Sequence, residues 1–510
     1  MGAAFSFWAA CAPGAEKRPN IVIILADDMG FSDLACYGGE IETPHLDALA
    51  ASGRRFTQFY NAGRCCPTRA SFLTGLYQHQ AGMGEMTNDR GKPGYRGRLN
   101  DKCVTVAEVA GAAGYLTAVS GKWHVGSAEA GALPLARGFQ RFYGIPEGGG
   151  IYKALKKGRT LMLNDEVIAR ADEGNLPDDW YVTDAFTDYG LRFIDEAREA
   201  GKPFFLYLAH IAPHFPLQAD AADIAKYEGR YADGWEAVAR RRLERQVASA
   251  LFPEGTKASG QPSGVKDWTG VKQKERFERL MGTYAACVER MDQSVGRLVA
   301  ALRERGELEN TLILFLSDNG ASAEGGAAGR TEGDPTRADS NWWAGRSWAW
   351  VSNAPFGKFK KYAHEGGIAT PLIAHWPAGL GSEGRWERGV AHIVDLMPTV
   401  VELTGGTYPA ERKGQKVPAM EGRSLLPLLR GEPWPERALF WEHYGNAAVR
   451  SGDWKLVREG GKGRWELYDL ATDRTERKNL AAGKEEIVQE LEQQWLAWAR
   501  RCGVAPDGRP

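Results

Sequence analysis

Residues 20–30, NIVIILADDMG, contain the pattern from which the fold can be predicted. Residues 20–25 form a nearly uninterrupted apolar run, which is typical of a strand buried on both faces of a sheet. Two carboxylates, Asp27 and Asp28, follow at once. The same order returns in YLTAVS (115–120) before Lys122 and His124, in PFFLYLA (203–209) before His210 and His214, and in TLILFL (311–316) before Asp318 and Asn319.

Helical signals separate these apolar runs. Thr43 and Pro44 provide a capping residue and a first-turn proline before HLDALAASG, and the segments 104–114 and 183–203 carry glycine where helices often end. Alternating strands and helices with apolar strands predict an α/β fold, in which a largely parallel sheet is covered on both faces. IATPLIAHWP (368–377) predicts one more buried strand.

The pattern changes near residue 436. The stretch from 437 to 470 alternates between polar and apolar residues, with turn signals at 451–453 and 460–461, which predicts antiparallel hairpins. EEIVQELEQQWLAWARR (485–501) predicts an amphipathic closing helix. We therefore expect an N-terminal segment over 1–18, a catalytic domain over 19–435 and a smaller C-terminal α+β subdomain over 436–510.

Composition excludes some classes of partner. The 64 Lys and Arg residues and the 65 Asp and Glu residues nearly cancel, so bulk charge predicts no nucleic-acid partner. The basic run RRRLER (240–245) is interpreted as the solvated face of a helix. No stretch after the N-terminus reaches the roughly 18 apolar residues that a membrane span needs.

The first residues bear on location. Residues 2–12 are uncharged and fairly apolar, and weakly resemble the core of a secretory signal without its basic start. A lipoprotein signal at WAAC (8–11) is the alternative. We expect a periplasmic or secreted protein. The seven cysteines are scattered and include no CxxC, so neither a zinc cage nor a disulfide framework is indicated.

The polar residues that follow the strands predict a ligand site, because ligands of open α/β sheets bind beyond the carboxyl ends of the strands. Asp27, Asp28, Asp318 and Asn319 offer hard oxygen ligands, which suit Ca²⁺ or Mg²⁺. The site prediction depends only on the order of strands and polar residues.

The segment RCCPTRASFLTG (64–75) adds a second signal. Pro67 favours a helix start, and TRASFLTGLYQH (68–79) is expected to continue the helix. Cys65 then lies at the positive end of this helix and Arg69 one turn on, where it can bind a sulfate or phosphate. A reactive thiolate and a buried structural cysteine are both compatible with these residues. The tyrosine-phosphatase loop is excluded, because it needs five residues between Cys and Arg and this chain has three.

Several ordered motifs resemble one family. CCPTRASFLTG resembles the C-x-P-x-R signature of the type I sulfatases, whose cysteine is oxidised to formylglycine, and GYLTAVSGKWH (114–124) resembles their second signature. Further blocks follow in the family order over about residues 19–480. They are NIVIILADDMGFSDLACYGG, APHFPLQA, LSDNGASAEGG, NAPFGKFKKYAHEGGIATPLIAHWP and RSGDWKLV.

The resemblance implies an alkaline-phosphatase-like α/β/α sandwich around a large, mostly parallel mixed sheet, with a smaller C-terminal subdomain of antiparallel sheet plus helix. It also implies the site roles. Cys65 becomes formylglycine (3-oxoalanine), and an oxygen of that residue joins Asp27, Asp28, Asp318 and Asn319 around a divalent cation. Arg69, Lys122 and His124 contact the formylglycine hydrate, and His214 and Lys360 hold the sulfate and leaving group. Lys360 is chosen because it lies five residues before Glu365, the family spacing.

The chemistry of the resemblance explains the residue types. One hydroxyl of the hydrated aldehyde attacks sulfur and expels the alcohol, which His214 or Lys360 protonates, and the second hydroxyl, deprotonated by His124, then expels sulfate. We expect an arylsulfatase-type sulfuric ester hydrolase that acts on an aryl or carbohydrate sulfate and is matured by a formylglycine-generating enzyme. The alternatives are a phosphonate or phosphate monoester hydrolase of the same superfamily and a catalytically silent sulfate-binding relative.

Some aromatic and histidine residues remain open at this point. His210 is the strongest additional candidate for the site, ahead of the other unassigned histidines His364, His375, His392 and His443. Trp342, Trp343, Trp348 and Trp350 are compatible with a platform for a sugar or aryl ring and equally with packing.

Overall fold

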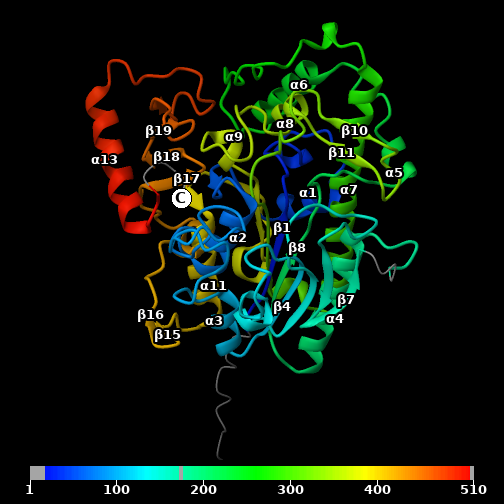
Figure 1. Cartoon of the computed structure of the whole chain (residues 1–510), viewed down its shortest axis with the longest axis vertical. Coiled ribbons are helices and arrows are strands. Elements are labelled where there is room, and N and C mark those ends of the chain that lie inside the picture. The colour runs from blue at the N-terminus through cyan, green and yellow to red at the C-terminus, as the bar shows by residue number, and fades with distance from the viewer. Residues whose placement is uncertain (1–17, 172–175, 506–510) are drawn as a thin grey trace, which may run out of the picture.

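A ten-stranded mixed sheet runs through the centre of the molecule (Figure 1). The computed structural model describes residues 18–171 and 176–505, so the N-terminal segment expected over 1–18 lies, apart from Arg18, outside the described residues. The strands, in their order across the sheet, are β13 (Arg385–Glu387), β2 (Arg54–Phe56), β12 (Leu372–His375), β9 (Thr311–Ser317), β1 (Asn20–Ala26), β8 (Phe204–Ala209), β4 (Leu116–Lys122), β5 (Arg141–Ile145), β6 (Thr160–Leu163) and β7 (Glu166–Arg170).

The sheet is mostly parallel, as the sequence predicts. β1 pairs in parallel with β9 and β8, and β4 pairs in parallel with β8 and β5. β12, β6 and β7 pair antiparallel with their neighbours. The four predicted apolar runs therefore lie next to one another, and their carboxyl ends meet at one edge.

Side chains of β1 alternate between two apolar cores. Ile21, Ile23 and Leu25 pack with helices on one face, and Val22 and Ile24 pack with helices on the other. Figure 1 shows α2, α3 and α11 on one side of the sheet and α4 and α7 on the other. Because every strand residue here is buried, the sequence shows a continuous apolar run instead of alternation. The α/β/α sandwich is confirmed.

The helices, in chain order, are α1 (Pro44–Ala51), α2 (Cys65–Thr74), α3 (Val106–Ala112), α4 (Val182–Glu199), α5 (Ala221–Ala225), α6 (Trp235–Ala248), α7 (Lys274–Glu304), α8 (Arg346–Ser352), α9 (Glu365–Ile368), α10 (Pro377–Leu380), α11 (Leu396–Thr404), α12 (Leu426–Arg430) and α13 (Glu485–Cys502). Among the described residues, no helix is both long and apolar enough to cross a lipid bilayer.

The C-terminal part of the chain forms a four-stranded antiparallel sheet, as predicted. Its strands are β17 (Leu439–His443), β18 (Asn446–Ser451), β19 (Trp454–Arg458) and β20 (Glu466–Asp469). α13 packs against this sheet through Trp495 and Trp498, and the indole N–H of Trp495 donates to the Trp441 carbonyl at 3.0 Å. The chain on both sides of α2 contacts this sheet: Trp441 Nε1 donates to the Asn61 carbonyl at 2.8 Å, and Gln78 Nε2 donates to the Glu442 carbonyl at 2.9 Å.

Three local expectations are corrected. The helix that begins at Cys65 ends at Thr74 and does not continue to residue 79, because Gly75 adopts a left-handed φ of 69° and its N–H caps the Ser71 carbonyl. The strand expected over 368–377 covers only Leu372–His375, since α9 occupies the residues before it.

The basic run at 240–245 is also not a fully solvated face. Arg242 of α6 is fully buried and forms ion pairs with Asp33 at 2.8 Å and Glu40 at 2.7 Å. Buried arginine requires such partners, and these two lie about 200 positions earlier in the chain, beyond the reach of a local sequence pattern.

Candidate active site

The residues predicted from the strand ends lie together at the carboxyl edge of the sheet. β1 and β9 pair in register, with Ala26 opposite Ser317, so Asp27 and Asp318 follow from adjacent strands. The backbone N–H of Asp28 donates to Asp318 Oδ1 at 3.3 Å. The amide of Asn319 donates to Asp28 Oδ1 at 2.7 Å. All of these side chains are buried.

Three cationic side chains reach the acidic cluster, which consists of Asp27, Asp28, Asp318 and Asn319. The Lys122 ammonium contacts the Asp27 carboxylate. Lys360 Nζ lies 2.7 Å from Asp28 Oδ1. Both lysines are buried, because Lys122 ends β4 and the segment of Lys360 packs beside the start of α2, where the N–H of Lys361 donates to the Gly63 carbonyl at 2.8 Å.

Arg69 connects α2 to the acidic cluster. Its Nε and Nη2 donate to Asp318 Oδ2 at 3.1 and 2.9 Å, and its Nη1 donates to the Lys122 carbonyl at 2.8 Å and to the Tyr207 hydroxyl at 3.1 Å. Thr68 Oγ1 donates to the Asp318 carbonyl at 2.6 Å. These contacts fix the first turn of α2 against the end of β9.

The acidic cluster has the donor set of a divalent cation site. Burial alone would raise the pKa of Asp27, but Lys122, His214 and Arg69 hold that pKa at about 2. Burial and the neighbouring Asp27 carboxylate raise the pKa of Asp318. Asp27 Oδ1 and Asn319 Oδ1 are buried oxygens without a hydrogen-bond partner in the described part of the chain. Buried, unpaired hard oxygens beside carboxylates fit Ca²⁺ or Mg²⁺.

Cys65 is the first residue of α2 and is only 1% exposed. Ligand atoms of Cys65, Cys66 and His124 lie within 4.8 Å of one another. A hydrogen bond from Cys66 lowers the pKa of the Cys65 thiol, and burial opposes this, while Lys122, His124 and Lys360 lower it further. Cys65 therefore lies among hydrogen-bonding and cationic groups, unlike a cysteine that only packs in an apolar core.

His124 follows β4 with a left-handed φ of 60°. Gly148 makes room for its ring, because a Cβ at position 148 would lie 1.9 Å from His124 Nε2. Burial lowers the pKa of His124 to about 4, although the nearby Cys65 opposes this shift. The ring is therefore neutral at neutral pH and can accept a proton.

His214 lies on the loop after β8. Its Nδ1 is 2.5 Å from the Phe215 carbonyl, which can only accept a hydrogen bond, so Nδ1 carries a proton. Its Nε2 lies 3.6 Å from Asp28 Oδ2. Burial lowers the pKa of His214, against the opposite effect of Asp28 and Asp27.

The positions of the four tryptophans distinguish packing in the core from a platform for a sugar or aryl ring. Trp342, Trp348 and Trp350 are buried in the core. Trp343 is half-buried and stacks on Phe215, with ring centroids 3.8 Å apart, and Phe215 in turn contacts the His214 ring. Of these four tryptophans, Trp343 alone is connected to a predicted site residue, His214, and the connection runs through the Phe215 ring.

Sequence reasoning missed two polar neighbours of the site. The Tyr207 hydroxyl contacts Arg69, and its position inside an apolar strand gave no signal. Glu324 lies 3.2 Å from Arg64, 2.8 Å from Lys361 and 3.3 Å from Lys360. Its place in the block LSDNGASAEGG, six residues after Asp318, was the one available signal.

An α/β/α sandwich that carries a charged centre at the carboxyl edge of a mostly parallel sheet is the architecture of the alkaline phosphatase superfamily of hydrolases. Residues 19–406 match the family described as Sulfatase, and residues 355–500 match the one described as N-sulphoglucosamine sulphohydrolase, C-terminal. The chain belongs to the sulfatase family, as its motifs predict, and is an enzyme that hydrolyses sulfate esters.

Similar proteins cover most of the chain. An uncharacterized sulfatase of Schizosaccharomyces pombe is 34% identical over 548 residues, which cover 96% of each chain. An arylsulfatase of Klebsiella aerogenes is 34% identical over 409 residues, covering 76% of this chain and 87% of that protein. The crystal structure of Ps i-CgsB in complex with k-i-k-neocarrahexaose superposes with a TM-score of 0.70 at 25% identity, covering 95% of this chain and 93% of that one.

Proposed function

We propose that the chain hydrolyses aryl or carbohydrate sulfate monoesters with a formylglycine made from Cys65 and a divalent cation bound beside it. The observation that carries this proposal is the meeting of Cys65, His124 and three buried cationic side chains with the acidic ends of β1 and β9. The formylglycine supplies a hydrated aldehyde whose hydroxyl is the nucleophile toward sulfur.

Asp27, Asp28, Asp318 and Asn319 would hold the cation, Ca²⁺ in preference to Mg²⁺, together with an oxygen of residue 65. When bound, the cation adds positive charge beside the sulfate. Support comes from the unpaired oxygens of Asp27 and Asn319 and from the high density of buried carboxylate charge.

Lys360 binds the negative charge of the sulfate group, and Lys122 and Arg69 place further positive charge beside residue 65. A sulfate monoester is a dispersed anion, and preorganised cations in a buried site stabilise charge that spreads in the transition state. Arg69 is fixed by its two bonds to Asp318, so it needs no rearrangement during turnover. Lys360 would exchange its contact with Asp28 for the ester.

The two histidines move protons. His124, neutral at neutral pH, accepts a proton from the hydrated residue 65 at a ring nitrogen. His214 holds its Nδ1 proton on the Phe215 carbonyl, so it delivers a proton to the leaving oxygen from Nε2, and only in its doubly protonated imidazolium form. Lys360, a cation whose pKa is raised by Asp28 despite its burial, is the second proton donor in reach of the ester.

Similarity supports the substrate class. The relative from Klebsiella aerogenes is an arylsulfatase, and the structure of Ps i-CgsB contains a neocarrahexaose. We further propose a periplasmic or secreted location, maturation by a formylglycine-generating enzyme, and the division into a catalytic domain over 19–435 and a subdomain over 436–510.

The test compares turnover of matched 4-nitrophenyl sulfate, phosphate and phenylphosphonate esters by protein co-produced with a formylglycine-generating enzyme. We expect the sulfate ester to have the highest kcat/KM, and Cys65→Ser to lose turnover with its fold unchanged by circular dichroism. A higher kcat/KM for the phosphate or phosphonate ester would reject the sulfatase assignment. Full activity in Cys65→Ser would reject the role of formylglycine.

A further inference from the structure

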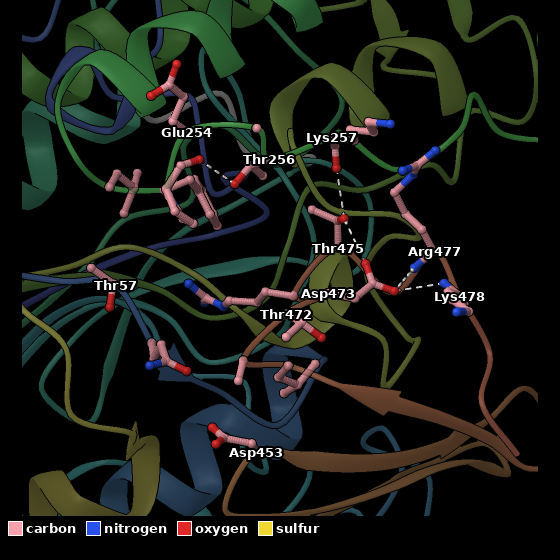
Figure 2. A pocket seen from close by; sticks show the side chains of 18 of the residues that line it. Thr57, Glu254, Thr256, Lys257, Asp453, Thr472, Asp473, Thr475, Arg477 and Lys478 are labelled. Atoms are coloured by element: carbon pink, nitrogen blue, oxygen red, sulfur yellow. Dashed lines mark hydrogen bonds between the residues drawn. The ribbon is translucent and has the colours of Figure 1, made fainter. Parts of the chain in front are cut away.

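A cavity of about 500 Å³ lies away from the acidic cluster, between the loop 251–257 and the segment 470–478 (Figure 2). None of the proposed catalytic residues lines it. Its floor includes Thr57 and Gln58 of the catalytic part of the chain, and one wall belongs to the segment that follows β20. The cavity therefore lies where the large sheet domain meets the C-terminal sheet.

The cavity lining carries an excess of positive charge, with Lys257, Arg388, Arg474, Arg477 and Lys478 against Glu254, Asp453 and Asp473. Lys257, Arg388, Arg477 and Lys478 line it and are exposed, and none of the four forms an ion pair among the residues that the structure describes. The whole chain, by contrast, has a formal net charge of −1. Cations gathered in a concave site focus the field on an anionic ligand.

Three carboxylates also line the cavity, and none of them forms an ion pair with these four cations among the residues that the structure describes. Asp473 Oδ2 accepts the backbone N–H groups of Arg477 and Lys478 at 2.8 and 2.7 Å, so its carboxylate is used to shape the segment. Figure 2 shows Lys257, Arg477 and Lys478 on one side of the cavity, with Glu254 and Asp453 apart from them.

The cationic wall is fixed in place. Thr475 Oγ1 donates to the Lys257 carbonyl at 2.8 Å, which joins the loop 251–257 to the segment 470–478. The Ser259 N–H donates to the Pro355 carbonyl at 2.8 Å, so this wall also contacts the segment that leads to Lys360. These bonds hold in place the backbone segments that carry the cations.

A second cavity of about 250 Å³ continues the first and shares Gln58, Arg388 and Asp453 with it. It adds Trp434 and three arginines to the lining: Arg423, Arg437 and Arg450. Arg437 is paired with Asp395 and Glu436 also lines this cavity, so Arg423 and Arg450 are the arginines that extend the positive field. Trp434 offers an apolar ring, over which Arg423 lies, as ligand sites for sugars and other rings often do. The two cavities together fit an elongated anion better than a single small ion.

We propose that these joined cavities bind the sulfate groups of a sulfated oligosaccharide, as a second site separate from Cys65. Arginine and lysine side chains bind sulfate oxygens, and several cations along a groove match charges that repeat along a glycan. The link to the substrate rests on the proposed function. The binding itself does not, because it requires neither formylglycine nor the cation.

The test measures direct binding of a heparin-derived hexasaccharide by calorimetry, in a Cys65→Ser background so that the probe is not consumed. The variant Lys257→Gln/Arg477→Gln/Lys478→Gln should bind about tenfold more weakly, since three exposed charge contacts are lost. The matched control, Lys102→Gln/Lys202→Gln/Lys416→Gln, removes three exposed lysines elsewhere and should change the affinity less than twofold.

With Cys65 intact, both triple variants should keep the kcat/KM of the parent for 4-nitrophenyl sulfate. Equal affinity of the two triple variants for the hexasaccharide would overturn the proposal. Equal binding of the chemically desulfated hexasaccharide, or of a single-stranded DNA of equal charge, to the parent would overturn it as well. Selective loss of binding, together with no sulfatase activity in the parent protein that retains Cys65, would support this site while rejecting the proposed function.

Discussion

Replacing Gly148 by alanine tests the position of His124 without changing any charged residue. The added Cβ would lie 1.9 Å from His124 Nε2, whereas ordinary contact begins at 3.4 Å. The His124 ring must therefore move by about 1.5 Å, the difference between these distances. The backbone of Gly148 does not require a left-handed φ, so the clash with the ring is the main effect.

A displacement of this size is large for proton transfer. Misplacing a reacting group by about 1 Å can lower the rate about 100-fold, which corresponds to about 2.7 kcal/mol of transition-state stabilisation. We expect Gly148→Ala to lower kcat for 4-nitrophenyl sulfate about 100-fold. The content of formylglycine and of metal should stay that of the parent, because Gly148 contacts neither Cys65 nor the acidic cluster in its closest contacts.

The assay pairs steady-state kinetics with thermal unfolding. Gly270→Ala is the matched control, because a Cβ there meets nothing within 4 Å and the residue has no left-handed φ. The control should retain full kcat and the same Tm. If Gly148→Ala keeps kcat within about threefold of the parent, the ring of His124 is not the proton acceptor, and the reasoning from this contact is wrong.

Three further predictions concern the metal, the leaving group and acid stability. Asp318→Asn should lower the bound metal measured by elemental analysis and reduce turnover about 100-fold or more; full metal content would contradict the ligand assignment. His214→Ala should reduce kcat/KM about 100-fold for alkyl sulfates and much less for nitrophenyl sulfate, whose leaving group needs no proton; equal losses would remove His214 from this role. His210 is fully buried, and burial lowers its pKa to about 3. As the pH falls below 6.5, this histidine is protonated in the unfolded chain but still neutral in the folded protein, so the free energy of unfolding decreases toward acid. His210→Phe should reduce the slope of unfolding free energy against pH between 6 and 4 by about 1.4 kcal/mol per pH unit, and an unchanged slope would contradict this.

Much of the fold was predictable because the strands are buried on both faces. Such strands produce apolar runs that a local pattern can identify, and parallel pairing then brings their ends together without further information. Asp27 and Asp318, about 290 positions apart, were placed in one site on this basis. Their registered strands explain why the prediction of proximity is confirmed.

Other features depend on contacts that no local pattern records. Lys360 lies outside regular secondary structure, and only the family spacing selected it from three nearby lysines. Arg242 looked solvated because its partner Glu40 is far away in the sequence. Glu324 became visible only when the loop after β9 was placed beside Arg64, and Tyr207 only when β8 was placed beside Arg69.

The central claim is that Cys65 is converted to formylglycine while its neighbour Cys66 remains a cysteine. Mass spectrometry of the tryptic peptide 65–69, CCPTR, after alkylation of free thiols tests it most directly. In active enzyme, the account predicts one alkylated cysteine at Cys66 and a 3-oxoalanine at position 65. Two alkylated cysteines in fully active enzyme would contradict it.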